Sequence, residues 1–299
     1  FAAEAEAFRD DLVRAYRWAQ ARTPAMRVSD GTFTPGVPSM VHCFGKTGEF
    51  FAGEDWNRSW AGDVEIGPHH LAALGLMDPA SRDVDGMVAT LEDYWFLQDG
   101  MGAYPGEASR ADWYHLGGFS KVQPYYTRVA EIHALRDDVK PFIRAYFNAI
   151  PSLLNCENLS FWEHFHNTGG WNKTHETGWF LTQTRTMLVT ERGSELWLAP
   201  FVTSNWLRPG MSVSVRRAPT RFGPVSYVIR AAAENVIEAT IDPPVRSAPE
   251  ALVIRIRHPR GRQLKRVWIN GTEHKGFDPA REWVRLTPSR ERIHVRAEF

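Results

Sequence analysis

The spacing of apolar residues changes once along this 299-residue chain, and that change constrains the fold more than any other feature. Before residue 193 apolar residues recur at helical intervals, as Phe8, Leu12 and Tyr16 do. After it they alternate with polar residues, as in the run MSVSVRR. The sequence therefore predicts a helical domain over 1–192, followed by an antiparallel β-sandwich over 193–299.

Local signals refine this division. Pro124 is placed in the first turn of a helix, where proline is tolerated, and Asp137 and Asp138 are placed as cap residues of the next helix. Asn270-Gly271 predicts a tight hairpin between two short strands. Periodicity predicts about six helices, over residues 8–19, 64–77, 84–95, 122–133, 139–150 and 177–190.

Charge is balanced overall but divided between the two parts. The chain has 35 basic and 35 acidic residues, so nothing attracts it as a whole to nucleic acid or to an anionic membrane. Residues 193–299 hold 18 Lys/Arg and 10 Asp/Glu (+8), which leaves 17 and 25 (−8) for residues 1–192. This contrast indicates either two modules with different roles or two solvated faces of different charge.

Targeting and redox signals are weak. No apolar run approaches the roughly 20 residues of a membrane span. The chain starts at Phe1 without a signal-peptide pattern, so we expect a processed chain or a fragment, and the compartment stays open. Cys43 and Cys156 are too few for a disulfide framework.

Three stretches mix carboxylates with tryptophans. The stretch FWEHFHNTGGWNKTHETGWF (161–180) is the densest, since it adds several histidines. Ionisable groups are costly to bury and tryptophan is seldom exposed, so one shared pocket with wet and apolar walls satisfies both. Taken singly, these carboxylates are better explained as helix caps or partners of arginine. The residues concerned are Asp55, Trp56, Arg58 and Asp63 in 53–67, Asp112 and Trp113 in 105–121, and Glu163, His166, Trp171, His175 and Glu176 in 161–180.

Other chemistries have little support. His164, His166 and His175 lack the tight spacing of a metal site, so we expect neither a metal nor a cofactor. The arginine-rich run VIRIRHPRGRQLKR (253–266) could bind a polyanion, but its alternation favours a solvated face of a sheet.

Two segments carry a resemblance to a known group of enzymes. The junction ELWLAPFVTSNWLRPGMSVSVRRAPTRFGPVSYVI (195–229) and the hairpin VWINGTEHKG (267–276) resemble the C-terminal part of bacterial glycoside hydrolases with an (α/α)6 barrel. The broad group that includes the α-L-rhamnosidases is the most similar. A complete barrel of this kind has twelve helices, so the resemblance implies an N-terminal portion or a second chain that completes the toroid.

The resemblance implies hydrolysis of a glycosidic bond by an acid and a base carboxylate, most often with inversion. The catalytic candidates are Glu163, Asp55, Glu176 and Asp112. Glu163 is expected to be the acid because it follows an aromatic residue and precedes a histidine. Glu176 suits the base because it opens a helix. The expected sugar-binding residues are Trp56, Trp113, Trp171, His166, His175, Asp63 and Arg58.

Two other functions remain open from the sequence. A polysaccharide lyase of toroid-plus-sandwich type needs a tyrosine or histidine base and a group that neutralises a uronate. Its unsaturated product absorbs ultraviolet light, whereas the product of a hydrolase does not. A non-catalytic carbohydrate-binding or assembly subunit would bind sugar without turnover. The residues available to a lyase are Tyr125, Tyr126, His166, Asn167 and Arg144.

Overall fold

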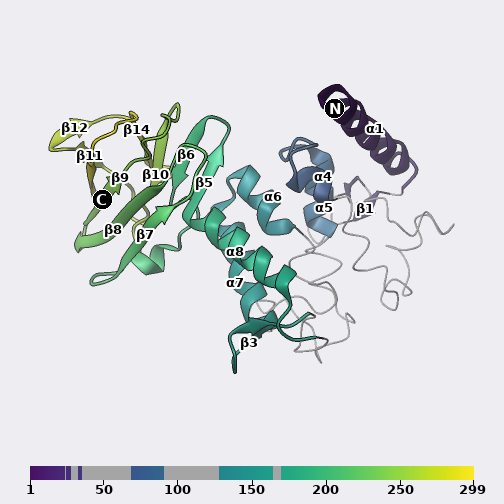
Figure 1. Ribbon diagram of the computed structural model, residues 1–299, viewed down its shortest axis with the longest axis horizontal. Coiled ribbons are helices and arrows are strands. Elements are labelled where there is room, and N and C mark those ends of the chain that lie inside the picture. The colour runs from purple at the N-terminus through teal and green to yellow at the C-terminus, as the bar shows by residue number, and fades with distance from the viewer. Residues whose placement is uncertain (24, 28–32, 36–68, 91–127, 164–169) are drawn as a thin grey trace. The chain divides into compact units, whose positions relative to one another are not determined.

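The computed structural model describes residues 1–23, 25–27, 33–35, 69–90, 128–163 and 170–299 (Figure 1). By their contacts the residues form two compact units, Phe1–Leu181 and Thr182–Phe299. The division falls inside helix α8 (Thr174–Leu188), so this helix belongs to both units. A domain boundary near residue 193 stays a prediction.

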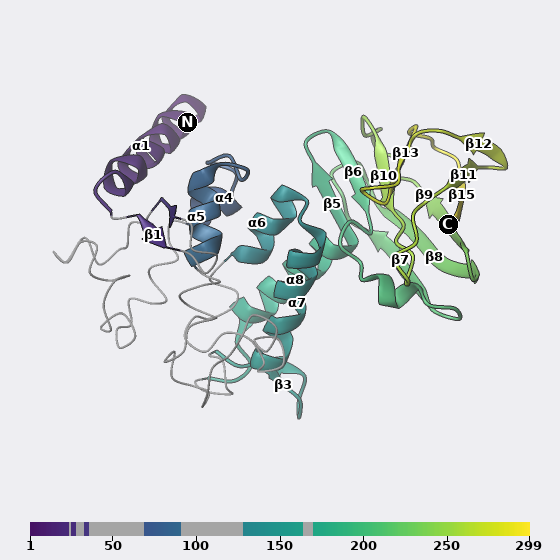
Figure 2. The same ribbon diagram turned by 180° about the vertical axis from the view of Figure 1, so that it is seen from behind.

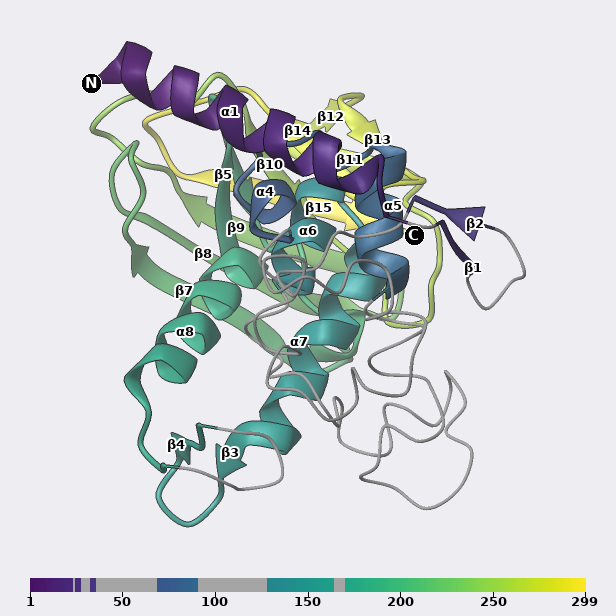
Figure 3. The same ribbon diagram turned by 90° about the vertical axis from the view of Figure 1, so that its right-hand side faces the viewer.

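The first unit is helical among its described residues. It also contains two ribbons of very short strands, β1 with β2 and β3 with β4. Figure 3 shows that α7 runs into β3, and that the N-terminal end of α8 lies on the same side of the unit. The elements are α1 (Ala2–Gln20), β1 (Met26–Arg27), β2 (Phe33–Thr34), α4 (His69–Ala73), α5 (Arg82–Thr90), α6 (Val129–Arg136), α7 (Val139–Leu153), β3 (Leu154–Asn155) and β4 (Ser160–Phe161).

Helix α7 supplies the main apolar face of this unit. Phe142, Tyr146 and Leu153 lie three to four residues apart, or multiples of that, and are at most 5% exposed. The ring centroids of Tyr146 and Phe180, on α8, are 6.0 Å apart. Phe161, on β4, packs against Leu153 in the same cluster. This packing holds α7, β4 and the first half of α8 together.

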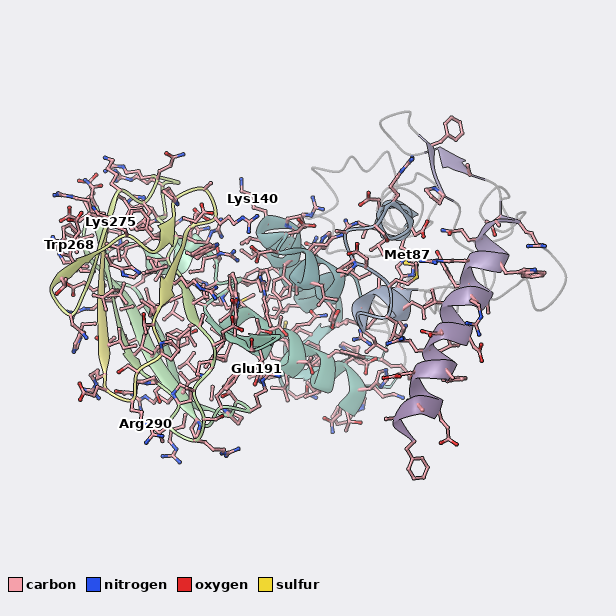
Figure 4. The ribbon with its side chains drawn as sticks, turned by 90° about the horizontal axis from the view of Figure 1, so that it is seen from above. Met87, Lys140, Glu191, Trp268, Lys275 and Arg290 are labelled. Carbon is pink, nitrogen blue, oxygen red and sulfur yellow. The ribbon has the colours of Figure 1, made fainter. Side chains whose placement is uncertain are left out.

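Helix α1 packs through one residue. Tyr16, the one buried residue of α1, is 6% exposed, and burial together with the charge of Asp83 on α5 raises its pKa. Figure 4 shows Met87 on the side of α5 that faces α1. The other large apolar side chains of α1 are exposed, including Phe8 and Trp18 at 64% and 62%.

Two predictions concern the starts of helices in this unit. The placing of Pro124 in a first helical turn lies outside the described residues, and within them α6 begins at Val129, after Arg128 in a left-handed conformation (φ 52°). Asp138 occupies the N-cap position of α7, as predicted, but its side chain makes no cap hydrogen bond. It lies 3.4 Å from His133 Nδ1 instead.

The second unit is the predicted β-sandwich. One sheet has five strands in the order β13-β14-β10-β6-β5, and the other has six in the order β12-β11-β15-β9-β8-β7. In Figure 2, β5, β6, β10 and β13 follow one another across the first sheet. The strands are β5 (Val189–Arg192), β6 (Glu195–Leu198), β7 (Ser212–Ala218), β8 (Val225–Ala233), β9 (Val236–Asp242), β10 (Leu252–Arg255), β11 (Arg266–Ile269), β12 (Thr272–His274), β13 (Phe277–Asp278), β14 (Trp283–Leu286) and β15 (Ile293–Glu298), with a 3-10 turn η5 (Ser204–Leu207).

The period-two pattern explains the six-stranded sheet. Val213 and Val215 of β7 are buried while Ser212 and Ser214 are exposed, and β8, β9 and β15 alternate in the same way. The change from helical to alternating spacing is therefore confirmed for the described residues.

Strand β10 departs from that pattern, because every residue in it is buried. Arg255 is only 2% exposed, and its guanidinium donates hydrogen bonds to the carbonyl oxygens of Pro200 (2.6 Å) and Arg281 (3.1 Å). Arg257 pairs with Glu282 at 2.7 Å. The prediction that the arginines of 253–266 lie on a solvated face is thus wrong for Arg255, because β10 is an inner strand of its sheet. Arg257 follows β10, and its side chain is 12% exposed.

The predicted hairpin at Asn270-Gly271 is confirmed. Strands β11 and β12 pair in antiparallel fashion up to Ile269 opposite Thr272. Asn270 and Gly271 have φ angles of 51° and 84°. Two consecutive positive values are typical of the type I′ turn, which matches the twist of the flanking strands.

Tyr227 joins strand β8 to the end of α8, and its replacement by phenylalanine is expected to cost about 1 kcal/mol of unfolding free energy. The tyrosine is 1% exposed, and its hydroxyl donates to the carbonyl of Leu188 at 2.8 Å. Phenylalanine keeps the apolar packing and loses only this bond. Urea unfolding of both proteins measures the difference, and equal midpoints at equal slopes would contradict it.

Candidate active site at the N-terminus of helix α8

A short backbone ladder precedes α8 and positions the described part of the densest cluster. The Glu163 N–H donates to the Gly170 carbonyl at 2.8 Å, and the Lys173 N–H donates to the Phe161 carbonyl at 3.1 Å. The Trp162 N–H donates to the Leu153 carbonyl at 2.8 Å, which ties the ladder to α7. Glu163 therefore lies beside the residue that directly precedes α8.

The Glu163 carboxylate is held by two donors. Its Oε1 lies 2.9 Å from Lys173 Nζ, and its Oε2 accepts a hydrogen bond from the Gly170 N–H at 3.2 Å. A Cβ atom on residue 170 would come within 3.1 Å of Lys173 Cε, so glycine leaves room for the pair. The Glu163 side chain is 31% exposed, so it is both anchored and open to solvent.

These surroundings change the reasoning about the role of Glu163. In the sequence, the preceding aromatic residue and the following histidine predict a protonated acid. A lysine ammonium and an amide N–H at hydrogen-bonding distance favour the charged carboxylate instead. The described geometry therefore suits a base or a charge-stabilising group better than a proton donor.

Glu176 lies in the first turn of α8, as predicted from its place at the start of a helix. Its side chain is 0% exposed, and its Oε1 lies 2.6 Å from His175 Nε2. His175 is 37% exposed, so the pair consists of an accessible imidazole and a buried carboxylate that orients it. The helix N-terminus adds a favourable field for negative charge at Glu176.

Trp179 lies on the same face of α8, one turn after Glu176. The Arg128 guanidinium carbon lies 4.1 Å from the centre of the Trp179 ring, and Arg128 Nε lies 3.7 Å from Glu131 Oε1. Burial lowers the pKa of Arg128, although Glu131 acts in the opposite direction. An arginine, a glutamate and a tryptophan thus meet on the buried side of α6 and α8.

Arg128 and Glu131 were missed by the sequence analysis. Both fell inside a predicted helix, where a charged residue usually faces solvent. Arg128 is 8% exposed and has a left-handed backbone, and no motif in the sequence indicates that conformation.

The predicted site residues divide into two groups. Glu163, Trp171, His175 and Glu176 are described. Glu163 contacts Lys173, which directly precedes α8, and Glu176 lies in the first turn of the helix, so both glutamates lie at its N-terminal end. Trp171 is 60% exposed and so offers a ring to solvent at this end. The convergence of the three loops stays a prediction, because Asp55, Trp56, Arg58, Asp63, Asp112, Trp113 and His166 lie outside the described residues.

The described residues show neither a metal cluster nor a membrane-spanning helix. No group of three or more His, Cys, Asp or Glu side chains in this part of the chain is arranged to hold a metal ion. None of the helices described here combines the length and the apolar character needed to cross a membrane.

Comparison with known proteins gives structural neighbours only. No family model and no curated protein matches the sequence. A solved structure named glycoside hydrolase is 10% identical, with a TM-score of 0.39 over 80% of this chain and 47% of that one. A GH127 β-arabinofuranosidase is 9% identical, with a TM-score of 0.40 over 80% and 42%. An α-L-rhamnosidase from Dictyoglumus thermophilum is 13% identical, with a TM-score of 0.35 over 59% and 21%.

The chain thus spans less than half the length of each of these three proteins. Glycoside hydrolases, an α-L-rhamnosidase among them, are among the solved structures that it resembles, as the sequence resemblance predicted.

Proposed function

We propose that the chain carries part of the active site of a glycoside hydrolase that acts on oligo- or polysaccharides. One observation supports this most directly: Glu163 and Glu176 are held at the same end of α8, in opposite surroundings, with the exposed Trp171 close by in sequence. Glycoside hydrolysis needs two carboxyl groups that differ in protonation, and an indole ring stacks well on the C–H face of a sugar.

In this proposal Glu163 is the charged carboxylate that activates water. Lys173 and the Gly170 N–H fix its position and preserve its charge. The proton donor is one of the other predicted carboxylates, which are Glu176, Asp55 and Asp112. An inverting enzyme places the two carboxyl groups about 6.5–9.5 Å apart, which leaves space for the water.

The helical unit is proposed to form part of an (α/α)6 toroid that further residues of the protein or a second chain complete. The exposure of Phe8 and Trp18 on α1 supports this, since large apolar side chains on one helix favour a covering partner. A structure of the longer protein or complex, with α1 packed inside a closed ring of helices, is the test.

A polysaccharide lyase is the second candidate, and the His175–Glu176 pair favours it. A lyase needs a base that removes a proton beside the uronate carboxyl group, and an accessible imidazole oriented by a buried carboxylate suits that task. The residues considered earlier for this role, other than Arg144, lie outside the described part of the chain.

One assay separates the candidates. The protein is incubated with neutral and acidic polysaccharides and with a panel of aryl glycosides. Release of reducing ends without new ultraviolet absorbance is the expected result for a hydrolase. A rise in ultraviolet absorbance that matches the release of reducing ends would assign a lyase. Sugar binding without either signal would assign a non-catalytic subunit.

A further inference from the structure

The arginines of the sandwich differ in one respect, which is whether they have a carboxylate partner. Half of the exposed ones are paired with described residues, at 2.9 Å in Arg230–Glu238 and at 2.8 Å in Arg260–Glu234, for example. Others with partners are Arg257, Arg262, Arg266, Arg285, Arg292 and Arg296. Four exposed arginines near one turn form no ion pair with any described residue. They are Arg216, Arg217, Arg221 and Arg246.

A β-bulge exposes Arg216 and Arg217 to solvent. The register between β7 and β8 runs from Val215 opposite Tyr227 to Ala218 opposite Val225, so Arg216 and Arg217 together face the single residue Ser226. Arg217 has a φ of 50°, and its N–H donates to Ser226 Oγ at 2.9 Å. Regular alternation would direct one of two consecutive side chains into the core, whereas the bulge leaves both exposed.

Arg221 and Arg246 lie on two segments whose backbones are hydrogen-bonded to each other. The Arg246 N–H donates to the carbonyl of Phe222 at 3.1 Å, which binds the segment of Arg246 to the turn of Arg221. Gly223 has a φ of 114°, and a Cβ atom there would lie 3.1 Å from Arg246 Cβ, so the two segments pack closely. The four arginines therefore extend from a rigid base.

The nearest acidic group is already engaged. Glu191 accepts from the Arg221 N–H at 3.1 Å and from Arg185 Nη2 at 2.9 Å. Burial raises the pKa of Glu191, but these donors lower it by more, so the pKa lies below its usual value. Both of its oxygens are thus used by groups other than the four exposed guanidinium groups. Glu191 is labelled in Figure 4.

Edge protection alone does not explain this surface. Strand β7 is an edge strand, and charged side chains on an edge discourage pairing with another sheet. That role accounts for Arg216, but Arg221 and Arg246 lie outside any strand. Four like charges on a rigid turn repel one another, and an anionic ligand removes that repulsion.

We propose that Arg216, Arg217, Arg221 and Arg246 form a binding surface for an acidic polysaccharide, whose uronate carboxylates or sulfate esters pair with the guanidinium groups. All four are arginine, and the planar guanidinium fork binds carboxylate and sulfate oxygens in pairs. The one aromatic ring in the turn, Phe222, is 7% exposed, so it offers no surface for stacked nucleic acid bases. The choice of a glycan over other polyanions rests on the proposed function.

The test compares two double variants with the same change in charge. Arg216→Glu with Arg246→Glu alters the proposed surface. Arg260→Glu with Arg262→Glu alters two arginines of the same unit that are paired with Glu234. Binding of polygalacturonate, heparin, a neutral dextran and duplex DNA is measured by affinity electrophoresis at low and moderate salt.

The wild-type protein is expected to bind polygalacturonate or heparin, weakly at higher salt, and not the dextran. The first double variant is expected to bind about tenfold more weakly, and the second to change little. Equal losses in both variants, no binding of either acidic glycan, or preferential binding of DNA would each overturn the proposal. This binding assay needs no turnover, so its result is independent of whether the chain cleaves a glycoside.

Discussion

Glutamine in place of Glu163 is expected to lower kcat on a susceptible glycoside by about 10²-fold or more, with little change in substrate affinity. The substitution keeps the size of the side chain and an oxygen for the Gly170 N–H, but it removes the negative charge that is proposed to activate water. The ion pair with Lys173 is about one-third exposed, so its loss contributes little to stability. Steady-state kinetics on the best substrate from the panel measures the effect.

Glu157→Gln is the matched control, because Glu157 is an exposed carboxylate in the turn between β3 and β4. It is expected to keep wild-type kcat. Lys173→Gln is expected to reduce kcat less than Glu163→Gln does, since it misplaces the carboxylate without removing it. A folded Glu163→Gln protein with wild-type turnover would remove Glu163 from the mechanism.

Phe142→Ala is expected to cost about 3–5 kcal/mol of unfolding free energy in the helical unit. Phe142 is 0% exposed on the inner face of α7, and its ring lies 6.4 Å from that of Tyr146 in a stacked arrangement. Alanine removes both the buried apolar surface and this ring contact, and it leaves a cavity. Urea unfolding followed by the helical circular dichroism signal measures the loss.

Phe8→Ala is the control for the same chemical change at an exposed site. Phe8 is 64% exposed on α1, so the substitution is expected to change the free energy of unfolding by less than about 0.5 kcal/mol. Equal losses at the two positions would show that the burial of Phe142 does not contribute to stability as described.

The sequence predicted the sandwich better than the helices, for a physical reason. Alternation is fixed by the strand itself, so Val213, Val215 and the Asn270-Gly271 turn could be placed from local residues alone. The start of α6 depends on the left-handed backbone of Arg128, which the surrounding packing sets. The burial of Arg255 depends on the inner position of β10 in its sheet, and strand order does not follow from periodicity.

In the candidate site, too, features set by local sequence could be predicted, whereas contacts set by tertiary packing could not. The position of Glu176 in the first turn of α8 follows from helix signals, and the structure has it there. The partner of Glu163 could not be foreseen, because Lys173 reaches it only through the ladder that pairs 161–163 with 170–173. The contact with Lys173 is the reason why Glu163 is proposed as the base rather than as the acid.

Strand β10 has a consequence for the rate at which the sandwich folds. It pairs with β6 in parallel, with Leu252 opposite Leu196 and Ile254 opposite Leu198, and the chain builds β7, β8 and β9 of the other sheet in between. Closing so long a loop costs conformational entropy before the pairing of β6 with β10 contributes any stability. Strands β7, β8 and β9 instead pair with their neighbours in sequence. We therefore expect the local meander to form before β10 docks, and refolding of this unit to take on the order of milliseconds to seconds.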